Sequence, residues 1–285
     1  KQNLKTYLDV DTENNYYYSE VKGRELYFVN EGLKVPKYGQ AELVEAETSF
    51  TAYQEFQSML TRDRIDIFMV GEFDDYQVLQ ALHRFPLEGR QVDLQFSYSQ
   101  PYVNVVKEKR EPRQSSQSIL HLGYQFPCQY GDKHYFALIV LNAMFGEFAH
   151  SVLFTTLREK EGLAYSISSQ FDIFTGLLEV YAGIEQSNRN QAMRVISREL
   201  NYIKLGRFSS SLLNQTKKII RMNALLSEDH ALTLVEQRFN KVIFGDKSLS
   251  LENWLDEIDK VTKKDVCRVA RQVKLQSLFF LEGVS

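Results

Sequence analysis

Two side chains, Arg158 and Tyr165, are the strongest candidates for chemistry in this chain of 285 residues. A guanidinium and a phenol can both donate hydrogen bonds to peptide carbonyls, and arginine can also bind a carboxylate through two parallel bonds. Gly162, between them, predicts the end of a helix, because glycine adopts the left-handed conformation there without steric cost. Leu163, Tyr165 and Ile167 then fall on one face of a predicted strand. We therefore expect Arg158 and Tyr165 to flank one helix-to-strand corner and to converge on a ligand.

A purely structural role is the alternative for both residues. Arg158 would then form a surface ion pair, and Tyr165 would be half-buried at the edge of a sheet. The spacing by itself favours this structural interpretation.

Metal chemistry has little support in the sequence. The motif H-x-x-E-H supplies two zinc ligands and a general base in one class of peptidases, and the chain does not contain it. Glu147 and His150 are three residues apart and can share a helix face, but two ligands are too few for a structural zinc site. The histidines, of which no two are three or four residues apart, are His83, His121, His134, His150 and His230. We expect neither a metal nor a catalytic residue in this chain.

The segments around the corner carry a family resemblance. Leu157–Ser166 reads L-R-E-K-E-G-L-A-Y-S, residues 141–146 read L-N-A-M-F-G before it, and residues 175–183 read T-G-L-L-E-V-Y-A-G after it. Together they resemble the C-terminal, inactive domain of the pitrilysin-type (inverzincin) zinc metallopeptidases, which include insulysin and mitochondrial processing peptidase. The resemblance implies that Arg158 and Tyr165 bind substrate opposite a partner domain's active site. Residues 147–151 read E-F-A-H-S where the family has a glycine- and serine-rich turn.

The patterns along the chain predict an α+β fold. We expect an antiparallel or mixed sheet covered by helices, with strands at 118–126, 163–174, 176–184 and 278–281, preceded by the end of a similar domain. The three expected regions are a mostly helical remainder of a first peptidase-like domain (1–85), a linker with an extended segment (86–114) and the second, inactive domain (115–285). A capped helix followed by an apolar strand and a glycine occurs at 48–71 and again at 262–283, which favours two similar domains. The first of these copies predicts a strand at 66–71.

Composition restricts the setting of the protein. The net charge is −3, without a long basic run, and no apolar stretch reaches the ~20 residues that span a bilayer. We expect neither nucleic acid nor a membrane as partner. The two cysteines, Cys128 and Cys267, do not suggest a disulfide framework and favour a reducing cytoplasm.

Three functions follow from the resemblance. In the first, the chain is the non-catalytic part of a zinc protease and holds peptide or small-protein substrates for a catalytic subunit or a second copy, as a heterodimer or dimer. In the second, it is the C-terminal part of an active zinc endopeptidase whose H-x-x-E-H lies upstream. In the third, it has a structural role alone. Zinc is expected in the catalytic partner or in an N-terminal domain, and not in this chain.

Overall fold

The central strand of the sheet, β2 (Ser118–Gln125), is buried on both of its faces. In the computed structural model, which describes residues 1–85, 90, 92 and 98–284, five strands pair in the order β1-β5-β2-β4-β3. β2 runs antiparallel to β4 (Leu177–Ile184) and to β5 (Lys274–Val284). β1 (Lys107–Gln114) runs parallel to β5, and β3 (Ala164–Asp172) pairs antiparallel with β4. The predicted α+β fold is confirmed, and its sheet is mixed.

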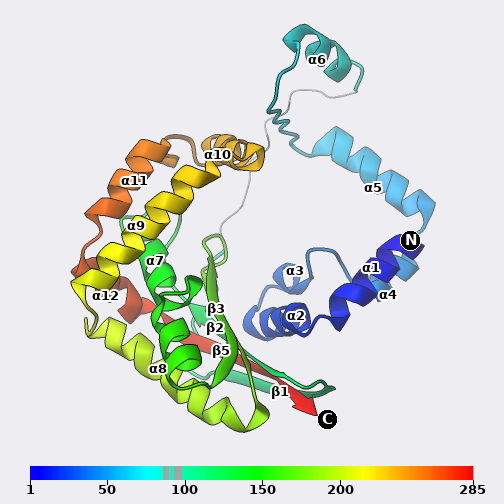
Figure 1. Ribbon diagram of the computed structural model, residues 1–285. Coiled ribbons are helices and arrows are strands. Elements are labelled where there is room, and N and C mark those ends of the chain that lie inside the picture. The colour runs from blue at the N-terminus through cyan, green and yellow to red at the C-terminus, as the bar shows by residue number, and fades with distance from the viewer. Residues whose placement is uncertain (86–89, 91, 93–97, 285) are drawn as a thin grey trace.

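The main core lies on one face of this sheet. Leu120, Leu122, Val180 and Phe280 point toward helices α7 (Tyr135–Asn142), α8 (Arg189–Lys204) and α12 (Lys263–Gln272). α9 (Ser210–Ser227) and α11 (Leu251–Lys260) form a further layer against α7. Figure 1 shows these helices together on the same side of the sheet.

Helix α2 (Asn15–Tyr27) packs against the opposite face, although it lies far away in sequence. Ile119, Phe279 and Leu281 form a small apolar cluster there with side chains of α2. The alternation predicted for residues 118–126 is therefore present, with apolar partners on both sides. The sequence showed two faces, but it did not show that a helix of the first region would cover one of them.

The first region is helical, as expected, and much of it is open to solvent. α4 (Ala41–Ala46), α5 (Ser49–Arg62) and α6 (Asp75–Leu82) contain no buried residue. Other helical segments are α1 (Gln2–Glu13), α3 (Glu31–Lys34), α10 (Ala231–Phe244) and two short 3₁₀ turns, Gln186–Asn188 and Gly245–Lys247. None of the helices in the described residues is long and apolar enough to span a membrane.

The strand predicted at residues 66–71 is absent from this structure. Residues 66–71 do not form a strand, because no neighbouring strand within the described residues supplies hydrogen bonds to this segment. Residues 210–244 are helical apart from a turn at 228–230, which separates α9 from α10. The linker expected at 86–114 lies partly outside the described residues, and its described end forms the strand β1.

Candidate functional site

Arg158 lies in a π-helical segment, Phe154–Lys160, which is a rare conformation. Its guanidinium lies over the ring of Phe154, with 4.8 Å from Cζ to the ring centre, and its side chain is exposed. Gly162 follows two residues after the segment, and its φ of 61° confirms the predicted glycine stop. The amide of Leu163 donates to the carbonyl of Leu157 at 2.8 Å, which closes the helix end. The corner therefore has a defined backbone while the arginine side chain reaches solvent.

Tyr165 sits at an irregularity in the sheet. The pairing of β3 with β4 shifts between Ala164 and Ser166, so that Tyr165 is the extra residue of a β-bulge. Tyr165 is 60% exposed, whereas Leu163 and Ile167 are buried. The prediction that Tyr165 shares a face with these two residues is therefore wrong, because the bulge turns its side chain away from the core.

The phenol of Tyr165 donates a hydrogen bond to Glu185 Oε1 at 2.9 Å. This hydrogen bond and the charge of the carboxylate raise the pKa of Tyr165, so that the hydroxyl stays protonated and can donate at neutral pH. Arg158 and Tyr165 therefore flank one corner, as predicted, and each has its own protein contact. The apolar residues beneath them, Leu157, Leu163 and Ile167, are 0%, 6% and 8% exposed.

Glu147 and His150 do not form a common site. Glu147 accepts a hydrogen bond from Asn142 Nδ2 at 2.8 Å, and His150 Nε2 lies 2.9 Å from Thr216 Oγ1. Glu147 is the last residue of a second π-helical segment, Ala143–Glu147, and His150 lies beyond its end. The described residues contain no group of three or more acidic, histidine or cysteine side chains placed to hold a metal ion.

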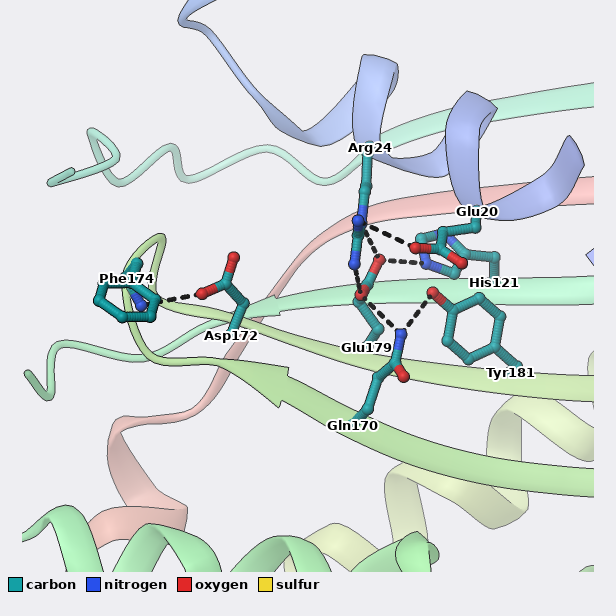
Figure 2. A network of polar contacts seen from close by, with 8 residues as sticks. All are labelled: Glu20, Arg24, His121, Gln170, Asp172, Phe174, Glu179 and Tyr181. Atoms are coloured by element: carbon teal, nitrogen blue, oxygen red, sulfur yellow. Dashed lines mark hydrogen bonds and ion pairs between the residues drawn. The ribbon is translucent and has the colours of Figure 1, made fainter. Parts of the chain in front are cut away.

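A buried polar network, which the sequence did not reveal, connects α2 to the sheet (Figure 2). Glu179 lies in the middle of the apolar strand β4 and is 0% exposed. Arg24 binds both of its oxygens, with Nε to Oε1 at 3.0 Å and Nη2 to Oε2 at 2.7 Å. Arg24 Nη1 also lies 2.9 Å from Glu20 Oε1. The signal available in the sequence was a glutamate within an apolar strand, which requires a buried partner.

His121 and Gln170 complete the network around Glu179. His121 Nε2 lies 3.1 Å from Glu179 Oε1, and Gln170 Nε2 donates to Oε2 at 3.2 Å. Burial by itself would raise the pKa of Glu179. The hydrogen bonds and charges of His121 and Arg24 outweigh this effect and lower that pKa to about 2. The carboxylate is therefore ionised, and α2 is held to the sheet through charge as well as through apolar contacts.

Gly23 of α2 makes the close approach of His121 possible. A Cβ on Gly23 would lie 1.7 Å from His121 Nδ1, and His121 is fully buried. We expect Gly23→Ala to lower the free energy of unfolding by about 1–3 kcal/mol, since α2 must move away from the sheet. Gly32→Ala is the matched control, because its Cβ would meet only the Asn30 side chain at 3.3 Å. Urea unfolding of both variants measures the difference, and equal stabilities would contradict this assignment.

Comparison with known proteins places the chain in a family. Residues 53–220 match the family model described as the peptidase M16 inactive domain. The chain is 31% identical over 284 residues to the probable inactive metalloprotease YmfF of Bacillus subtilis, covering 99% of this chain and 66% of YmfF. The crystal structure of a conserved protein from Enterococcus faecalis V583 matches with a TM-score of 0.94 and 36% identity, over 99% of this chain and 67% of that one.

A more distant solved structure has the same fold. A peptidase M16 inactive domain from Pseudomonas fluorescens shares the fold, with a TM-score of 0.75 at 15% identity, over 100% of this chain and 69% of that one. The chain belongs to the M16 peptidases, the pitrilysin-type family, and contains the region of their inactive domain. It spans about two-thirds of the length of YmfF.

Proposed function

We propose that this chain is the non-catalytic part of a pitrilysin-type zinc protease and that Arg158 and Tyr165 bind peptide for a catalytic partner. The observation that carries the proposal is the contrast at the corner between exposed polar side chains and the buried residues that support them. A residue kept for packing would be buried, and a residue without a role would not need a β-bulge beneath it. Bulges occur often beside active sites, where they redirect a side chain.

The position of β3 supports peptide binding at this corner. β3 stands at the end of the strand order, so that its outer edge has no strand neighbour among the described residues. An extended peptide can pair with such an edge through main-chain hydrogen bonds. Tyr165 lies at the start of this strand and Arg158 in the helical segment before it. The guanidinium donors, and the phenol once it releases Glu185, can bind carbonyls of the same peptide.

The partner in this proposal is a zinc-protease subunit of the family, or a second copy of the chain if it carries zinc ligands in another segment. Zinc belongs to that partner site, where it would supply a polarised water for hydrolysis. The two buried, unpaired cysteines fit a reducing compartment, and we propose the cytoplasm. We also propose the division of the chain expected from its sequence, into the remainder of a first peptidase-like domain (1–85), a linker (86–114) and the inactive domain (115–285).

Replacement of Tyr165 by phenylalanine tests the role of the phenol. We expect a loss of turnover of a few-fold to tenfold in the assembled complex, because one hydrogen bond from an uncharged donor is worth ~0.5–1.5 kcal/mol. Thermal stability should stay within the error of the measurement, since the hydroxyl is exposed. Tyr202→Phe, at another partly exposed tyrosine, is the control. Peptide turnover unchanged by Tyr165→Phe would remove Tyr165 from the proposed site.

The other two candidate functions predict different results. If the chain is part of an active endopeptidase, one polypeptide that contains it will carry H-x-x-E-H and will cut peptides without a second subunit. If its role is structural alone, Arg158 and Tyr165 variants will lose stability and keep full activity in the complex. Metal analysis of the 285-residue chain should find less than stoichiometric zinc under each of these alternatives, so the variants and not the metal content decide between them.

A further inference from the structure

A cavity of about 350 Å³ lies between α2, residues 33–38 and the turn that joins β3 to β4. Its size is within the range of sites that hold a small ligand or a single side chain. Asp172 and Thr175 form the wall on the side of the sheet, and Glu20 and Arg24 form the wall on α2. Figure 2 shows Asp172 pointing to the side of the sheet where α2 lies. The cavity is at the far end of β3 from the Arg158–Tyr165 corner.

The cationic side chains of the lining are largely neutralised by carboxylates. Arg24 contacts two carboxylates, Glu20 at 2.9 Å and Glu179 at 2.7 Å. Lys34 pairs with Glu31 at 2.6 Å. The third cation, Lys37, is exposed, with its Nζ 5.3 Å from the centre of the Tyr38 ring.

Asp172, in contrast, has a charge without a counter-ion. Its Oδ1 accepts a hydrogen bond from the amide of Phe174 at 2.9 Å, and the carboxylate has no ion-pair partner among the described residues. Figure 2 shows its other oxygen directed away from that contact. A carboxylate that faces a cavity and is not paired with a cation can accept hydrogen bonds from a positively charged ligand.

Thr175 gives an independent indication of a ligand. It is 8% exposed, and its hydroxyl has no hydrogen-bond partner in the part of the chain that the structure describes. A buried hydroxyl without a partner is costly, and such groups are rare in folded proteins. A donor bound in the cavity beside Asp172 would satisfy the hydroxyl oxygen and the carboxylate together.

We propose that this cavity binds the cationic side chain of a lysine or arginine residue in the peptide substrate. Asp172 would accept the charged donor, Thr175 would accept a second hydrogen bond, and the rings of Tyr17 and Tyr38 would face the cation. The Tyr38 ring already attracts one ammonium group, that of Lys37 at 5.3 Å from its centre. Because Lys37 is exposed, it can turn outward when a ligand cation enters.

This proposal deepens the proposed function and rests on it, since one peptide would occupy both places. Tyr165 and Asp172 are seven residues apart on β3, which corresponds to ~23 Å at the usual strand rise. A peptide extended along β3 would therefore need about seven residues to reach from the corner to the cavity. The substrate class is then an extended peptide with a basic residue about seven positions from the residue that binds at the Arg158–Tyr165 corner.

The experiment compares two fluorescent peptides that differ in one residue, lysine or norleucine, with the complete chain. We expect the lysine peptide to bind about tenfold more tightly, the usual effect of a hydrogen bond to a charged group. Thr175→Val should reduce this preference, and Asp172→Asn should abolish it. Asp256→Asn, on the exposed surface of α11, is the control and should keep the preference. Equal affinities for the two peptides would overturn the proposal, as would a lysine preference that survives Asp172→Asn.

A single blocked lysine is too short to reach the Arg158–Tyr165 corner from the cavity, so it tests the cavity by itself. Nα-acetyl-L-lysine methylamide should shift the amide resonances of residues 172–176 in the unaltered chain and not in Asp172→Asn, whereas the norleucine analogue should shift neither. If these shifts occur but Arg158→Ala leaves both peptide affinities unchanged, the corner is wrong and the cavity stands. If both peptides bind equally and lose affinity with Arg158→Ala, the corner stands and the cavity is wrong.

Discussion

Replacing Arg158 by alanine should lower peptide turnover by the assembled complex roughly ten- to a hundredfold. This range corresponds to the removal of a hydrogen bond from a charged donor, ~1.5–3 kcal/mol. The free energy of unfolding should change by less than about 1 kcal/mol, because the guanidinium stacks on Phe154 at the exposed surface and supports no buried group.

Two further variants make this experiment specific. Arg158→Lys keeps the charge and loses the planar fork of donors, so its turnover should lie between those of the unaltered protein and Arg158→Ala. Arg194→Ala, on the exposed face of α8, removes a cation from outside the site and should keep full turnover. An Arg158→Ala protein that is destabilised and fully active would show that the arginine has a structural role.

Breaking the buried network at Arg24 should have the largest effect on stability. We expect Arg24→Met to lower the free energy of unfolding by roughly 2–4 kcal/mol, since it leaves Glu179 charged and buried. The expected value is below that for fully buried pairs because the Arg24 side chain is 36% exposed. Combining Arg24→Met with Glu179→Met should cost less than Arg24→Met alone, because the uncompensated charge is then absent. A double variant less stable than the single one would contradict this account.

The same network predicts a dependence of stability on pH. Folding lowers the pKa of Glu179 from 4.5 to about 2, so the native state holds this carboxylate ionised where the unfolded chain begins to bind a proton. The stabilisation is fully present above the unfolded pKa and is lost as the pH falls through the folded pKa. Urea unfolding between about pH 5 and about pH 2 should therefore show a smaller loss of stability in Arg24→Met than in the unaltered protein.

The elements defined by local patterns were predictable from the sequence. The capped helix expected from residue 262 is α12, and its cap is a Thr262–Asp265 capping box. The strands at 118–126 and 163–184 could be predicted because their alternation and their turns are properties of adjacent residues. In the structure they share one sheet. The resemblance to the pitrilysin-type inactive domain is confirmed by the family match.

The rest depends on contacts between distant segments. The bulge at Tyr165 results from pairing with β4, and no local pattern in residues 163–169 reveals it. Arg24 and Glu179 are 155 residues apart, so that only the packing of α2 on the sheet brings them together. A glycine at position 23 lowers the helix propensity of its segment. Only the structure explains it, because a side chain there would collide with the His121 ring. Residues 66–71 have the composition of a strand, but a strand also requires a neighbour.

Hydrogen exchange of the assembled complex, with and without an uncleavable peptide, tests most directly whether this chain binds substrate at the corner and along β3. The account predicts slower exchange of amides in residues 157–172 when peptide is present. β1, at the other end of the strand order, serves as the internal control and should not change. Arg158→Ala should reduce the protection at the same peptide concentration. A complex that binds the peptide without protecting residues 157–172 would contradict the proposed role of Arg158 and Tyr165.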